Sequence, residues 1–207
     1  MFSGLIFGLA SLFTPQADLP QVASVQQELA VYAQDFSLDP QKVYIRNASF
    51  KNPSPFLTSG ASAACVVYIN DNGDAKRVWS HMLDGADASL QQAFATFSTG
   101  HELTHCLLAE PGQRLAKRES LERFLGIRFK NNVQFEETYG DLVGLAFLKQ
   151  QDPEHYDAVF ERLKEIRLEF ADRDPEHDSS AYLSEENSLF ASQLAARKTT
   201  VAVASNP

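Results

Sequence analysis

Residues 89–109 of the chain read SLQQAFATFSTGHELTHCLLA, a long and largely apolar segment with no internal proline. Ser89, followed three residues later by Gln92, resembles a capping box, which marks the start of a helix. The Pro111-Gly112 pair just beyond the segment is typical of a helix end. The segment therefore predicts one long helix. Its large apolar side chains can bury it in a core: Phe94, Phe97, Leu107 and Leu108.

Two histidines of this segment, His101 and His105, enclose the run His-Glu-Leu-Thr-His. Residues four apart share one face of a helix, so both imidazoles would point toward a common place. Zinc binds neutral imidazole nitrogen in a tetrahedral shell. Glu102 lies about 100° further round the helix and can take a proton from a metal-activated water without binding the metal. The run matches the His-Glu-x-x-His signature and predicts zinc-dependent hydrolysis of a peptide bond.

A third protein ligand is expected downstream, because a catalytic zinc keeps three protein ligands and leaves its fourth position to water. The residues FEETYGD at 135–141 provide the best candidates. Glu137 and Asp141 are four apart on a predicted helix and therefore share a face. Glu136 stays an alternative ligand, although it would pair with Gly140 instead of an acid.

The combination of His-Glu-x-x-His with a later Glu-x-x-x-Asp resembles the gluzincin metallopeptidases, over residues 89–149 of this chain. The resemblance implies a zincin-like domain in which Glu137 is the third zinc ligand. Asp141 would then accept the free N–H of a ligand histidine and fix its tautomer. In such enzymes the substrate pairs with a strand that precedes the motif helix, which here would lie within residues 64–82.

A second donor is expected beside the zinc, since water attack on a peptide carbonyl leaves an oxyanion. His177 is the first candidate, because it lies in a polar loop between two predicted helices. Tyr182 and Tyr139 are alternatives, and His81 could reach the site from a strand. A non-catalytic zinc-binding or interaction module is the other reading of the whole site. The presence of Glu102 argues against it, since a purely structural site has no use for that carboxylate.

A small sheet is predicted before the motif helix. Residues 64–69 are apolar and β-branched, residues 71–74 (Asp-Asn-Gly-Asp) have turn chemistry, and residues 77–82 can return as a second strand. The other expected elements are a helix at 21–36, a short strand at 43–45, a loop at 47–64, and further helices at 114–124, 134–150, 154–170 and 181–197. A sheet early and helices late indicate a single α+β domain, at 18–198, with a tail at 199–207.

The 207 residues are 44% apolar and carry a formal net charge of −9. This composition supports one packed domain, and the acidity makes nucleic acid a poor partner. The uncharged residues 1–17 resemble a signal peptide, although no Lys or Arg follows Met1. The apolar stretch is too short to span a bilayer. Export to the periplasm or medium is the expectation, and an N-terminal helix packed on a cytoplasmic domain is the alternative.

The chain has two cysteines, Cys65 and Cys106. They could pair in an oxidising compartment, or remain buried thiols in a reducing one. The sequence leaves both states open, because pairing depends on how closely their Cα atoms approach.

Overall fold

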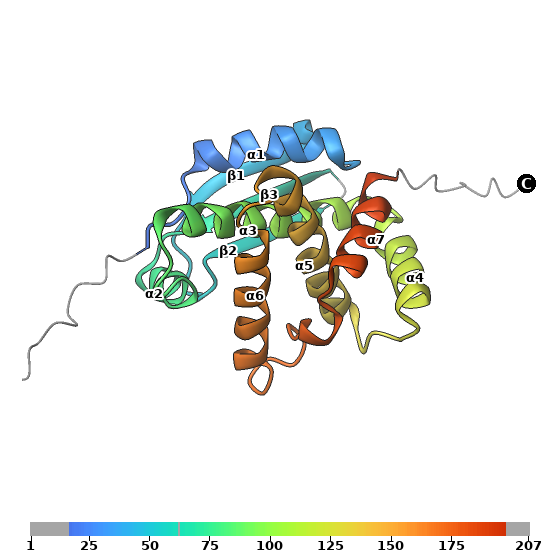
Figure 1. The fold of residues 1–207 in the computed structure, drawn as a ribbon. Coiled ribbons are helices and arrows are strands. Elements are labelled where there is room, and N and C mark those ends of the chain that lie inside the picture. The colour runs from blue at the N-terminus through green and yellow to red at the C-terminus, as the bar shows by residue number, and fades with distance from the viewer. Residues whose placement is uncertain (1–16, 62, 198–207) are drawn as a thin grey trace, which may run out of the picture.

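The computed structural model describes residues 17–61 and 63–197, which form a small sheet and a larger set of helices (Figure 1). The predicted tail at 199–207 and all of the predicted signal peptide except Ala17 lie outside the described residues. The elements, in chain order, are α1 (Val22–Asp35), η1 (Pro40–Lys42), β1 (Val43–Ala48), β2 (Phe56–Ala61), β3 (Ala64–Asn70), α2 (Gly73–Met82), α3 (Ala88–Ala109), α4 (Gln113–Leu125), α5 (Asn132–Gln151), α6 (Tyr156–Phe170), η2 (Ser180–Tyr182) and α7 (Glu185–Ala196).

The prediction of an α+β chain is confirmed. Figure 1 shows α3 crossing the middle of the molecule, with α1, β1 and β3 toward one side and α6, α7 and most of α5 toward the other. The helices predicted from periodicity are present as α1, α3, α4, α5 and α6, while the predicted helix at 181–197 is divided into η2 and α7. Within the described ranges, no helix is long and apolar enough to cross a bilayer.

The sheet has the strand order β1-β3-β2, with β1 parallel and β2 antiparallel to β3. The predicted hairpin partner of β3 at 77–82 is wrong, because those residues belong to α2. Asn72 explains the difference: its side chain accepts from the backbone N–H of Asp74 and Ala75 and caps a helix instead of closing a turn. Ala75 and Trp79, four apart, are then buried on one face of α2.

The strand that pairs antiparallel with β3 is β2, which lies inside the segment at 47–64 that was predicted to be a loop. Its Ser, Thr and Gly content gave no strand signal. Pairing with β3 and burial of Phe56 override this weak propensity. The structure thus places an edge strand, rather than a loop, beside α3.

Helix α3 begins two residues earlier than the predicted cap at Ser89 implies, and it has a different cap. Asp87, not Ser89, accepts from the backbone N–H of Leu90, and the Ser89 hydroxyl donates to the same carboxylate. The helix is buried over most of its length and lies closest to α5 at glycines. A Cβ on Gly144 of α5 would lie 2.9 Å from the carbonyl oxygen of Phe97 and 3.0 Å from the backbone nitrogen of His101.

A disulfide joins Cys65 on β3 to Cys106 on α3, with the two Cα atoms 5.5 Å apart. Both residues are buried. Strand β2 also passes close to α3, because a Cβ on Gly60 would lie 2.7 Å from the Cβ of Ala109. The sheet is therefore fixed to the helix directly beside His105.

We expect the variant with both Cys65→Ala and Cys106→Ala to lose about 4 kcal/mol of unfolding free energy, given that the bond closes a loop with a sequence separation of 41. The constraint on the unfolded chain is the main physical reason. Urea unfolding under non-reducing conditions measures the loss, and a reductant should leave the double variant unchanged. Equal stability of the oxidised wild type and the double variant would contradict this expectation.

Candidate metal centre

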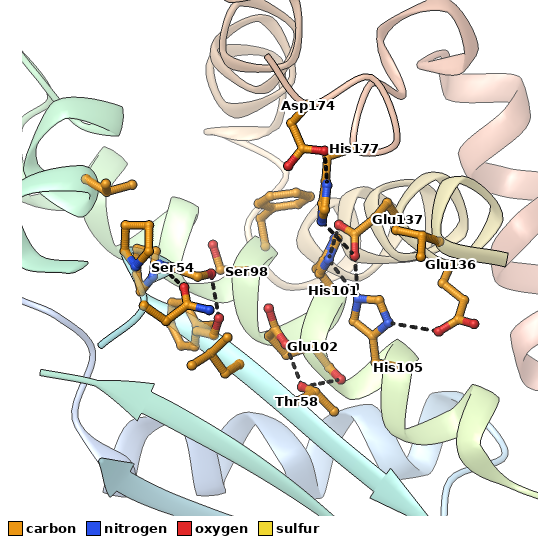
Figure 2. Close-up of a pocket in the computed structure, with 18 of the residues that line it drawn as sticks. Ser54, Thr58, Ser98, His101, Glu102, His105, Glu136, Glu137, Asp174 and His177 are labelled. Carbon is orange, nitrogen blue, oxygen red and sulfur yellow. Dashed lines mark hydrogen bonds and ion pairs between the residues drawn. The ribbon is translucent and has the colours of Figure 1, made fainter. Parts of the chain in front are cut away.

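The two motif histidines on α3 and Glu137 on α5 converge on one point (Figure 2). The Nε2 atoms of His101 and His105 are 3.1 Å apart. The Glu137 carboxylate completes a triangle, with Oε2 3.5 Å from Nε2 of His101 and Oε1 3.4 Å from Nε2 of His105. Among the described residues, these three form the group of His, Cys, Asp and Glu side chains able to hold a metal ion.

The spacing of these donors fits a tetrahedral zinc ion. Metal–ligand bonds of roughly 2.0–2.1 Å place neighbouring donors of a tetrahedron about 3.3–3.4 Å apart. The three separations of 3.1, 3.4 and 3.5 Å lie around that value. Two imidazole nitrogens and one carboxylate are also a donor set that catalytic zinc uses.

Glu136, the alternative ligand, lies elsewhere. Its Oε2 is 3.9 Å from Nδ1 of His105, on the far side of that ring from the converging Nε2 atoms. Its Oε1 pairs with Nε of Arg114 at 2.8 Å. Glu136 therefore faces the back of His105, and Glu137 faces the point where the imidazoles meet.

Asp141 fixes the orientation of His101. Its Oδ1 lies 2.9 Å from Nδ1 of His101, and because an ionised carboxylate only accepts, the imidazole must donate there. The Nε2 lone pair is then directed at the metal position. Arg167 donates to both carboxylate oxygens from Nε and Nη2, each at 2.7 Å, and the Ser179 hydroxyl donates as well. Burial raises the pKa of Asp141, but Arg167 and His101 outweigh it and lower the pKa to about 2.

The acids around the two histidines favour the protonated forms of these imidazoles when no metal is bound. Burial alone would lower the pKa of both histidines, but Asp141 and Glu137 raise that of His101 to about 9, and Glu136 and Glu137 raise that of His105 to about 10. In the same way, burial raises the pKa of Glu137, while the two histidines hold it well below its usual value. Because a histidine ligand binds metal as neutral imidazole, protonation of either ring competes with metal binding.

Glu102 and His177 flank the converging donors on opposite sides (Figure 2). Glu102 is turned toward β2, where the Thr58 hydroxyl lies 2.5 Å from its Oε2. His177 comes from the loop between α6 and η2, with Nε2 3.6 Å from Oε1 of Glu137 and Nδ1 2.8 Å from Oδ1 of Asp174. Both side chains line a cavity of about 910 Å³.

The cavity lies between β2, α3 and α6. Residues 52–60 line it along the edge strand, and the metal donors and Arg167 form part of its floor. Apolar side chains from three helices are also part of its lining: Val78, Met82, Phe97, Leu163 and Ile166. The cavity is therefore a groove lined from both the sheet edge and the helical half, with the three candidate metal ligands in its lining.

The other three candidates for an oxyanion donor do not face this groove. Tyr139 is fully buried, and its hydroxyl donates to the carbonyl of Ala191. Tyr182 packs edge-on against Phe129. His81 is on helix α2 rather than a strand and pairs with Glu169 at 3.1 Å. His177 is the candidate that the structure brings to the metal donors.

Several polar residues of the site had no signal in the sequence. Arg167 looks like an ordinary basic residue on the 154–170 helix, and Ser179 like a loop serine. Thr58 lies in the segment predicted to be a loop. Each joins the site only because distant elements meet, so the sequence pattern could not have identified them.

No protein-family model, curated protein or solved structure matches the chain. A function can therefore be inferred only from the residues of the site and from the resemblance of its two-part motif to that of the gluzincin metallopeptidases.

We expect Gly140→Ala to weaken zinc binding by about 10- to 100-fold, the usual cost of disturbing the groups that orient a ligand. A Cβ at this position would lie 2.9 Å from two ring atoms of His101, so the ring would have to leave Asp141. Competition with a fluorescent zinc chelator measures the affinity. Gly73→Ala is the matched control, because its Cβ would meet no atom within 4 Å. Equal affinities of the two variants would contradict the expectation.

Proposed function

We propose that this chain is a zinc-dependent peptidase of the gluzincin type, with a zincin-like domain. One observation carries the proposal. His101, His105 and Glu137 converge at tetrahedral spacing, while the Glu102 carboxylate lies beside them, outside the ligand group and facing a groove. A structural zinc site usually has four protein ligands and needs no adjacent free carboxylate.

Each residue of the site would have a separate role in the reaction. His101, His105 and Glu137 would hold the zinc, which supplies Lewis acidity toward the scissile carbonyl and toward water. Glu102 would take the proton of the attacking water and pass it to the leaving amine. His177, whose Nδ1 lies 2.8 Å from Oδ1 of Asp174, would donate from Nε2 to the developing oxyanion.

The substrate would be an extended peptide or protein segment that pairs with β2. This strand is at the edge of the sheet, and residues 52–60 line the groove. The open backbone groups of an edge strand are a template for one more strand. We therefore propose β2, at Phe56–Ala61, as the substrate-pairing strand in place of an arm within residues 64–82, because β3 is the central strand and already has a partner on each side.

Export from the cytoplasm is consistent with the disulfide of this chain. The Cys65–Cys106 disulfide supports residence in an oxidising compartment, where such bonds persist. Together with the apolar residues 1–17, it favours a periplasmic or secreted peptidase over a cytoplasmic one.

The test is cleavage of unfolded casein and of a quenched-peptide library by zinc-loaded protein. We expect hydrolysis by the wild type that a chelator abolishes and zinc restores. Glu102→Gln should lower kcat by at least about 100-fold while keeping its zinc, because the base is lost and the ligands remain. His177→Ala should lower kcat by about 100- to 1000-fold.

His155→Ala is the matched control, since His155 pairs with Asp152 and Ser89 and does not line the groove. It should leave cleavage unchanged. Equal rates for zinc-loaded wild type and Glu102→Gln would contradict the proposed function.

A further inference from the structure

The side chain of Thr58 has one close polar contact, and it is with Glu102 (Figure 2). Thr58 lies in β2, paired with Val67 of β3. Its Oγ1 is 2.5 Å from Oε2 of Glu102 and 3.5 Å from the backbone oxygen of the same residue. An ionised carboxylate only accepts, so the threonine donates its single hydroxyl proton, and the shorter contact is the hydrogen bond. Within the described ranges, no other side chain hydrogen-bonds the Glu102 carboxylate.

The elements around Thr58 hold this hydroxyl at a fixed place above α3. Strand β2 passes α3 so closely at Gly60 that a Cβ there would meet Ala109. The neighbouring strand β3 is bonded to α3 through the Cys65–Cys106 disulfide. Threonine is also β-branched, which restricts rotation about its first side-chain bond. The Thr58 hydroxyl is therefore held in a fixed position relative to α3, the helix that carries the Glu102 carboxylate.

A glutamate beside a zinc site needs such a restraint. Its side chain has several rotatable bonds, and its carboxylate oxygens are themselves good zinc ligands. Glu102 adjoins the ligand His101 in the chain, so an untied carboxylate could turn toward the metal position or toward Arg167. In either place it would no longer face a water in the groove.

We propose that Thr58 is a positioning residue for Glu102: its hydroxyl holds Oε2 against β2, which keeps the carboxylate out of the zinc shell and leaves Oε1 to accept the proton of the attacking water. This inference rests on the proposed peptidase function. Because Thr58 is on the strand with which the substrate would pair, the same strand aligns both the base and the peptide.

The kinetic test compares Thr58→Val, which removes the hydroxyl and keeps the shape, with Thr58→Ser, which keeps the hydroxyl. We expect Thr58→Val to lower kcat on the best peptide by about 10- to 100-fold, the range for losing one hydrogen bond to a charged group. KM should change less than about twofold, since ground-state binding is untouched. Thr58→Ser should recover most of kcat, and all three proteins should keep equal zinc. Equal kcat for wild type and Thr58→Val, or equal losses in both variants, would overturn the inference.

A second measurement needs no activity and uses metal-free protein. Urea unfolding of Thr58→Val, Glu102→Ala and the double variant forms a double-mutant cycle. We expect Thr58→Val to shift the unfolding midpoint in the presence of Glu102, and to shift it much less in the Glu102→Ala background. The same cycle with exposed Glu119→Ala should be additive. An additive Thr58–Glu102 cycle would overturn the inference while leaving the peptidase proposal standing. Zinc-loaded wild type that cleaves no peptide would instead refute the peptidase proposal, and the positioning role with it.

Discussion

The site depends on the close packing of α3 against α5. Gly144 lets the α5 backbone approach the carbonyl of Phe97, and Gly140 leaves room for the His101 ring. A larger residue at either position would push the helices apart. Without this approach, Glu137 could not come within 3.5 Å of both imidazole Nε2 atoms. The three candidate metal ligands are therefore brought together by the close backbone contact between the two helices.

Charge then fixes the side chains that the packing brings together. Asp141 is fully buried and joins three elements, because it binds His101 of α3, Arg167 of α6 and Ser179 of the following loop. A buried carboxylate is costly unless it is paired and hydrogen-bonded, as this one is. Behind the His105 ring lies a smaller and more exposed pair of charged residues, in which Arg114 is ion-paired with Glu136. The two imidazoles thus have different acids behind them: Asp141 hydrogen-bonds His101, and Glu136 lies 3.9 Å from Nδ1 of His105.

The sequence predicted most of the helical half and the strands β1 and β3, but it missed β2 and took α2 for a strand, and the reason is physical. Helices such as α3 and α5 carry long apolar periodicity, so they and the four-residue spacings on them could be identified from the chain alone. Strand β2 has no such pattern, because only its pairing with β3 makes it a strand. The same limit hid Thr58 and Arg167, whose roles come from contacts across 44 and 26 residues of sequence.

Zinc content of dialysed protein, measured by elemental analysis, tests the central claim most directly. We expect about one zinc per wild-type chain and its loss in both His105→Ala and Glu137→Ala, while Glu136→Ala keeps the metal. The comparison of the adjacent Glu136 and Glu137 discriminates best between the two possible third ligands, since only Glu137 faces the Nε2 atoms. Absence of zinc from the wild type after reconstitution would contradict this expectation. Loss of zinc in Glu136→Ala together with its retention in Glu137→Ala would contradict it as well.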